Sequence, residues 1–196
     1  SVELAIAGNI IDYGVKNSLN VEEELDKIIC YEQTAIEKEG KKVFDYQDFR
    51  RCLKRAKTIL YLGDNAGEVV FDRVLIEEIK KQDRRKEIFF AVRGAPIIND
   101  VLEEDAYFAG IDAGAVIINN GCAAPGTILN LCSNDFLKIY RKADMVISKG
   151  QGNFETLSRA KRGVFFLFKA KCPVVAKDIG CEVGDVCLFY SLSRKY

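Results

Sequence analysis

The sequence contains no histidine at any of its 196 positions. Without histidine, the chain cannot form a Ser-His-Asp or Cys-His catalytic arrangement in its usual form, and it cannot complete a mixed cysteine–histidine zinc site. Seven cysteines are present, but no two of them have the Cys-x-x-Cys spacing of zinc and redox motifs. We therefore expect reduced thiols, as in a cytoplasmic protein, and chemistry that relies on other groups.

The sequence also lacks an excess of charge of either sign and a long hydrophobic run. Basic and acidic residues number 29 each, so bulk electrostatic attraction to nucleic acid or to an anionic membrane has no support. The longest uncharged stretch, residues 113–134, is interrupted by asparagines, glycines and a proline, which excludes a membrane span there. No secretory signal is recognisable. We predict a cytoplasmic protein whose partner is a small molecule, with its oligomeric state left open.

The hydrophobic pattern changes near residue 57. Residues 1–56 follow a helical period, whereas residues 58–62 form a short continuous apolar run, as expected of a strand buried on both faces. Strand-like and helix-like patterns then alternate, with strands at 58–62, 88–92, 115–118, 145–148, 164–168 and 186–190 and helices at 69–81, 99–109, 134–141 and 154–161. This alternation predicts an α/β fold with a mostly parallel sheet. We expect a helical accessory region at 1–56 and a ligand-binding domain at 57–196, packed as one compact unit.

The first predicted strand leads directly into the segment Gly-Asp-Asn-Ala-Gly-Glu. Asp64 and Asn65 supply carboxylate and amide oxygens, which suit Mg²⁺ or Mn²⁺ and can also bind Co²⁺ or Ni²⁺. Gly63 and Gly67 permit a tight turn, and a helix beginning near Glu68 would point backbone N–H groups toward a phosphate. The alternative is a plain strand-to-helix turn in which Asp64 only caps the helix.

The second predicted strand leads into another polar segment. Arg93 offers a forked donor that matches phosphate oxygens. Asp100 could complete a metal site with Asp64 and Asn65, because the carboxyl ends of parallel strands meet at one edge of the sheet and ligands bind there. The alternative is that Asn99 or Asp100 merely caps the following helix.

Basic residues follow two later strands. The segment Lys-Gly-Gln-Gly-Asn-Phe-Glu, which begins at Lys149, has the composition of an anion-binding loop with Lys149 as a mobile point charge. Lys169 and Lys171 follow the next strand and could face the same edge, or could simply mark a solvated strand end. Together, the strand ends resemble a site where a metal ion and several cations hold a phosphoryl group. Since no histidine can act as a base, a metal-activated water is the natural nucleophile.

At these motifs the sequence resembles the damage-control phosphatases, formerly a domain-of-unknown-function family, and in particular their archaeal-type stand-alone members. The resemblance covers essentially the whole chain, and five motifs in the same order carry it: Ala7-Gly8-Asn9-Ile10-Ile11-Asp12, Gly63-Asp64-Asn65-Ala66-Gly67-Glu68, Gly94-Ala95-Pro96-Ile97-Ile98-Asn99-Asp100, the Lys149 segment and Lys169-Ala170-Lys171-Cys172-Pro173. It implies a Rossmann-like three-layer α/β core with an N-terminal helical region. It also implies metal-dependent phosphomonoesterase activity on small phosphorylated metabolites, such as sugar phosphates or damaged phosphometabolites.

The resemblance further implies a role for individual residues. One divalent metal ion (Mg, Mn, Co or Ni) would be held by Asp64, Asn65 and Asp100. Arg93 and Lys171 would act on the phosphoryl group together with Asp64, and substrate would be bound by Lys149, Gly150, Asn153, Lys169, Glu68, Asn9 and Asp12. Members of this kind usually carry a further N-terminal helical segment, which we expect this chain to lack.

Other functions are compatible with parts of the pattern. A direct aspartyl-phosphate route through Asp64 ranks lower, because Asp64 is needed as a ligand and the Asp-x-Asp-x-Thr/Val motif is missing. The chief competing enzyme is an S-adenosylmethionine-dependent methyltransferase, whose cofactor would also fit a glycine-containing turn after a first strand. The other alternative is a non-catalytic domain that binds a phosphometabolite.

Overall fold

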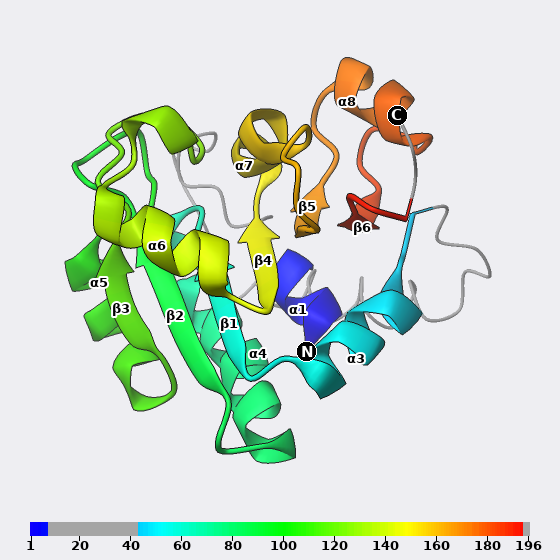
Figure 1. Cartoon of the computed structure of the whole chain (residues 1–196). Helices are drawn as coiled ribbons and strands as arrows, with labels where there is room; N and C mark the ends of the chain where they lie inside the picture. The colour runs from blue at the N-terminus through cyan, green and yellow to red at the C-terminus, as the bar shows by residue number, and fades with distance from the viewer. Residues whose placement is uncertain (8–42, 194–196) are drawn as a thin grey trace, which may run out of the picture.

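A computed structural model of the chain describes residues 1–7 and 43–193 (Figure 1). Its centre is a six-stranded sheet with the strand order β3-β2-β1-β4-β5-β6. The first five strands are parallel and β6 runs antiparallel to β5, which confirms the predicted mostly parallel sheet. The strands are β1 (Thr58–Leu62), β2 (Glu87–Val92), β3 (Val116–Asn119), β4 (Met145–Lys149), β5 (Phe165–Lys169) and β6 (Val186–Tyr190).

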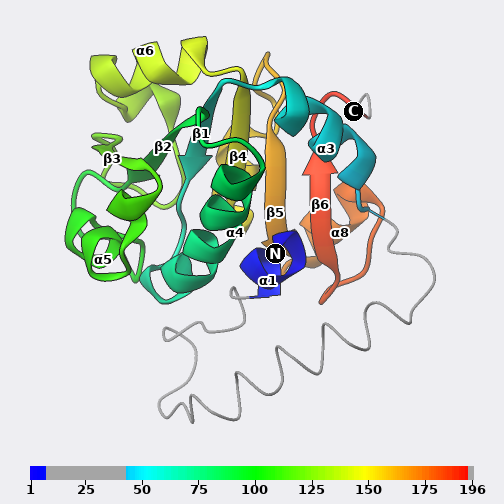
Figure 2. The same ribbon diagram turned by 90° about the horizontal axis from the view of Figure 1, so that it is seen from below.

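Helices cover both faces of this sheet and form a three-layer, Rossmann-like arrangement (Figures 1 and 2). One face packs against α1 (Val2–Ala7), α3 (Tyr46–Arg55), α4 (Val69–Gln82) and α5 (Glu103–Phe108). The other packs against α6 (Asn134–Lys142), α7 (Gln151–Leu157) and α8 (Pro173–Ile179). The connections contain the short 3₁₀ turns η2 (Ala66–Glu68), η3 (Ile111–Ala113) and η4 (Leu129–Leu131).

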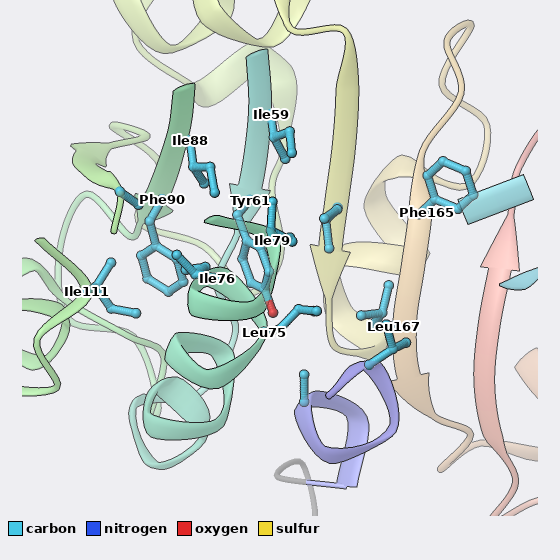
Figure 3. Packing of buried hydrophobic residues seen from close by; sticks show 14 of the residues in the cluster. Ile59, Tyr61, Leu75, Ile76, Ile79, Ile88, Phe90, Ile111, Phe165 and Leu167 are labelled. Carbon is cyan, nitrogen blue, oxygen red and sulfur yellow. The ribbon is translucent and has the colours of Figure 1, made fainter. Parts of the chain in front are cut away.

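The central strands are apolar throughout because they are buried on both faces. In β1, Ile59 and Tyr61 point into the core beneath α4, while Leu60 and Leu62 point into the core beneath α6 and α7. Figure 3 shows the first of these cores, with Leu75, Ile76 and Ile79 of α4 lying over Ile59 and Tyr61 of the sheet. The two cores fix the strand ends, and therefore the loops that leave them.

The N-terminal helical residues contribute to the same core. Val2, Ala5 and Ile6 of α1 are buried against α4 and β5, and Phe49 of α3 makes an edge-to-face contact with Phe165 of β5. The division at residues 56 and 57 stays a prediction. Asn9 and Asp12 lie outside the described residues. In the described part of the chain, no helix is long and apolar enough to cross a membrane.

The observed elements differ from the predicted ones mainly around the loops of the carboxyl edge. Strands β1 and β6 have the predicted bounds, whereas the helix predicted at 99–109 begins only at Glu103. Before it, the chain makes a turn at Ile98 and Asn99, and Asp100 forms an isolated antiparallel β-bridge with Asn65. The helix predicted at 154–161 instead spans Gln151–Leu157, directly after β4.

Candidate functional site at the carboxyl edge of the sheet

The strand order reverses between β1 and β4, which are hydrogen-bonded neighbours. The chain leaves β1 toward α4 on one face and leaves β4 toward α7 on the other (Figure 1). In an open parallel sheet, this topological switch point is where the loops diverge and a ligand crevice forms. Asp64 and Asn65 follow β1 here, and Gly150 follows β4.

Gly150 leaves room for the carboxylate of Asp64. The backbone of Gly150 has φ 79° and ψ 157°, a region that essentially only glycine adopts. A Cβ atom at this position would collide with the carboxylate of Asp64. The loop after β4 therefore passes directly against the side chain of Asp64, and a glycine is required there on both counts.

The bridge between Asn65 and Asp100 brings the loops after β1 and β2 together. The backbone N–H of Val101 donates to the carbonyl of Asp64 at 2.7 Å, and that of Ala66 donates to the carbonyl of Asn99 at 2.9 Å. The N-cap of α5 is Leu102, so neither Asn99 nor Asp100 caps that helix. The caps of η2 and α4 are Asn65 and Glu68, without side-chain cap bonds. The alternatives in which Asp64 or Asp100 serves only as a helix cap are thereby excluded.

The guanidinium of Arg93 contacts both Asp64 and Asp100. Its Nε donates to Asp100 Oδ2 at 2.5 Å, and its Nη2 lies 3.9 Å from Asp64 Oδ1. The Nη1 donates to Thr127 Oγ1 at 3.1 Å. Arg93 is only 2% exposed, and its guanidinium is held by these partners. Its predicted contact with phosphate oxygens stays a prediction. Thr127 was not predicted, since it lies far along the connection after β3 and not directly at the strand end.

Asn153 ties the ends of β1 and β4 together. Its Nδ2 donates to the carbonyls of Gly63 at 3.1 Å and Lys149 at 2.8 Å, and its Oδ1 accepts from Arg93 and from Thr127. The side chain is fully buried. Asn153 therefore contacts Arg93 within a network that fixes both loops, and its role in substrate binding stays a prediction.

The side chain of Lys149 is buried in ion pairs, whereas the sequence predicts a mobile charge in an anion-binding loop. It is completely buried, and its Nζ donates to Glu68 Oε2 at 2.8 Å and to Asp72 Oδ1 at 2.5 Å. Burial alone would lower the pKa of Lys149, but the two carboxylates outweigh it and raise that pKa. The prediction of a mobile point charge is wrong, because the side chain shares the inner face of β4 with Met145 and Ile147.

Sequence reasoning missed Asp72 and Tyr61, which complete this buried ion-pair cluster. The hydroxyl of Tyr61 donates to Asp72 Oδ1 at 2.7 Å. The sequence did contain a usable signal. Val69, Leu75 and Ile76 form the apolar stripe of α4, and the charged residue Asp72 lies on that stripe. A carboxylate at a core position needs a buried partner.

Replacing Lys149 with methionine is expected to lower the free energy of unfolding by about 3–5 kcal/mol, because it leaves two buried carboxylates without their counter-ion. The matched control is Lys138→Met, which removes a lysine from an exposed pair with Asp135 and should cost at most about 0.5 kcal/mol. Urea denaturation followed by circular dichroism measures both. Equal stabilities of the two variants would contradict the assigned role of Lys149.

The site carries more negative than positive charge. In the described part of the chain, four carboxylates and two cations are grouped here, which leaves a net charge of −2 when all are ionised: Asp64, Glu68, Asp72 and Asp100 against Arg93 and Lys149. Burial, followed by Glu68 and Asp100, raises the pKa of Asp64 to about 8. Burial also raises the pKa of Asp100 against the opposing effect of Arg93. A divalent cation would offset this excess charge.

The donor set fits a hard divalent cation. Nδ2 of Asn65 donates to Glu68 Oε1 at 2.7 Å and to Asp64 Oδ2 at 3.3 Å, so the amide presents Oδ1 as its ligand atom. Among residues 1–7 and 43–193, no group of three or more histidine, cysteine, aspartate or glutamate side chains is placed to hold a metal. The proposed set therefore depends on the amide of Asn65 as well as on two carboxylates.

The remaining predicted residues lie at the margins of this network. Lys169 ends β5 and is half-buried, whereas Lys171 is exposed and its backbone N–H donates to Gln151 Oε1 at 2.8 Å, at the start of α7. A pocket of about 470 Å³ is lined by Arg93, by Pro96 of the loop after β2, by Tyr107 of α5 and by Asn119 at the end of β3.

Fold and site together define a class: a doubly wound α/β protein with an acidic, amide-containing cluster at its switch point. Residues 1–187 match the family described as the damage-control phosphatase ARMT1-like domain, and the chain belongs to this family. This confirms the resemblance on which the sequence interpretation drew.

Individual relatives agree with this membership. The chain is 43% identical over 185 residues to an uncharacterised protein of Methanocaldococcus jannaschii, covering 92% of this chain and 58% of that protein. It is 40% identical over 191 residues to a damage-control phosphatase of Pyrococcus horikoshii, covering 96% and 63%. The crystal structure of a DUF89 family protein from Pyrococcus horikoshii superposes with a TM-score of 0.83 at 39% identity, covering 97% of this chain and 64% of that one. The chain thus spans about three fifths of the length of these relatives.

Proposed function

We propose that the protein is a metal-dependent phosphatase that hydrolyses small phosphorylated metabolites, either sugar phosphates or damaged phosphometabolites. The observation that carries the proposal is the β-bridge between Asn65 and Asp100, which gathers Asp64, Asn65 and Asp100 at the switch point with Arg93 between the carboxylates. Family membership supports the reaction class. We also propose that the protein acts in the cytoplasm, on the cysteine pattern of its sequence.

In this proposal, Asp64, Asp100 and Oδ1 of Asn65 would hold one divalent ion, Mg²⁺, Mn²⁺, Co²⁺ or Ni²⁺. Such an ion supplies positive charge to a phosphoryl oxygen and lowers the pKa of a water molecule. Asp100 already accepts a hydrogen bond from Arg93 Nε through Oδ2. The guanidinium therefore holds this carboxylate in place and adds fixed positive charge beneath the phosphoryl site.

The other basic residues have separate roles in the proposal. Lys171 follows β5, the strand beside β4, and is exposed, with its backbone N–H bonded to Gln151 at the start of α7. We therefore assign it to the phosphate and leaving-group oxygens, with Lys169 as a weaker candidate. Lys149 is committed to Glu68 and Asp72 and acts through them. Gly150 contributes its lack of a side chain beside Asp64.

Release of phosphate from p-nitrophenyl phosphate and from a panel of sugar phosphates, with Mg²⁺, Mn²⁺, Co²⁺ or Ni²⁺ and with chelator, tests this function. We expect turnover that requires a divalent ion and disappears with chelator. Turnover that is unaffected by chelator would contradict the metal dependence. Metal binding without turnover on any substrate would identify a non-catalytic phosphometabolite-binding domain, and tight binding of S-adenosylmethionine without metal would favour a methyltransferase.

A further inference from the structure

A buried chain of hydrogen bonds runs inward from Asn65. Asn65 Nδ2 donates to Glu68 Oε1 at 2.7 Å, and Glu68 Oε2 accepts from Lys149 Nζ at 2.8 Å. Lys149 Nζ also donates to Asp72 Oδ1 at 2.5 Å, and Tyr61 donates to the same oxygen at 2.7 Å. The four inner side chains have no solvent-exposed surface, so water cannot replace any of these bonds.

This series of hydrogen bonds determines which end of the Asn65 amide faces the cation site. The nitrogen and oxygen of an amide have nearly the same size, so packing alone does not fix its orientation. Glu68 does so electrostatically, because a carboxylate only accepts and therefore selects the Nδ2 end of Asn65 at 2.7 Å; the contact of the same Nδ2 with Asp64 Oδ2 is longer, at 3.3 Å. Glu68 cannot itself turn, since each of its oxygens has a different donor, Asn65 on one side and Lys149 on the other.

We propose that Glu68 is a positioning residue that holds the Asn65 amide with Oδ1 toward the divalent cation, and that Lys149, Asp72 and Tyr61 hold Glu68 in that orientation. The inference rests on the proposed function, in which Asn65 is a cation ligand. It gives Glu68 and Lys149 a different role from the substrate contact that the sequence predicts. It also explains why a site with surplus negative charge keeps a buried lysine: the lysine orients a carboxylate.

The test is to reverse the polarity of the contact between positions 65 and 68. Glu68→Gln leaves one acceptor oxygen, which the charged Lys149 should retain, so the new amide nitrogen lies opposite Nδ2 of Asn65. We therefore expect Mn²⁺ affinity to fall about 10- to 100-fold. In an Asn65→Asp background, two carboxylates face each other, and Glu68→Gln restores one donor and one acceptor. There we expect Glu68→Gln to leave Mn²⁺ affinity unchanged or to raise it. Electron paramagnetic resonance of free Mn²⁺ measures affinity without any substrate.

Two further variants separate positioning from simple charge. Glu68→Asp keeps the charge but is too short to contact both Asn65 and Lys149, so we expect it to weaken Mn²⁺ binding although Lys149 keeps a carboxylate partner. Glu77→Gln removes an exposed carboxylate from the same helix, α4, and should leave Mn²⁺ affinity unchanged. Melting curves without metal establish that each variant is folded.

The outcomes distinguish the inference from the function on which it rests. If wild-type protein binds Mn²⁺ but Glu68→Gln weakens binding equally in both backgrounds, Glu68 acts only through its charge and the positioning role is wrong. Unchanged affinity in Glu68→Gln or Glu68→Asp would also overturn it. If wild-type protein binds no divalent cation at all, the proposed function fails first, whatever the variants do.

Discussion

Replacing Asp64 with alanine is expected to lower kcat/KM for phosphate ester hydrolysis by a factor of about 10³ or more, while the fold stays intact. A bound divalent ion supplies several kcal/mol of transition-state stabilisation, and each 1.36 kcal/mol corresponds to tenfold in rate. The fold should survive, because burial and the neighbouring carboxylates raise the pKa of Asp64 to about 8. Its ionised form is therefore unfavourable in the metal-free protein, so its removal should cost the fold little.

Steady-state kinetics and melting curves of the same preparation test this expectation. Asp135→Ala is the control, since Asp135 is exposed and pairs with Lys138 on the surface of α6. It should retain the activity of the wild type. An Asp64→Ala variant that is folded and fully active would refute the metal and phosphate site at the switch point.

A second large effect is expected from Gly150→Ala, although the change adds a single methyl group. The new Cβ would collide with the carboxylate of Asp64, and the backbone would have to keep φ 79° and ψ 157° with a side chain present. Asp64 must then move out of the metal site, so we expect Mn²⁺ affinity and kcat/KM to fall at least about 100-fold, the upper range seen when a residue that orients a metal ligand is lost.

The control for Gly150→Ala is Gly180→Ala at the end of α8. Gly180 also has a positive φ, 77°, but a Cβ atom there would meet nothing within 4 Å. This variant should lose about 1–2 kcal/mol of stability from backbone strain and keep its activity. If both variants lose activity in proportion to their loss of stability, Gly150→Ala acts through general destabilisation. The contact between Gly150 and Asp64 would then have no role in function.

The fold was largely predictable because its signals are local. Strand β1 is a continuous apolar run with a glycine at its end, and β1 and β6 have the predicted bounds. The start of α5 was not predictable in this way. Asn99 and Asp100 are ordinary helix-capping residues in sequence, but here the chain pairs with Asn65, 35 positions earlier, and the helix is delayed to Glu103. A long-range backbone pairing of this kind leaves no periodic pattern.

The candidate site was predictable in part for the same reason. The rule that ligands bind at the carboxyl edge of a parallel sheet selects Asp64, Asn65 and Asp100, and the structure brings the three together. The rule does not say which way a side chain points. Lys149 ends its strand at the same edge but points into the core, because its ammonium group forms ion pairs there with Glu68 and with Asp72 of α4. Its role depended on a partner 77 residues away.

The most direct test of the account is a crystal structure of the protein soaked with Mn²⁺ and inorganic phosphate, with the metal located by anomalous scattering. The account predicts one strong anomalous peak within coordination distance of Asp64, Asp100 and Oδ1 of Asn65, with phosphate beside it. It also predicts that Nδ2 of Asn65 still donates to Glu68. A peak bound by other residues, or none at this edge of the sheet, would contradict it.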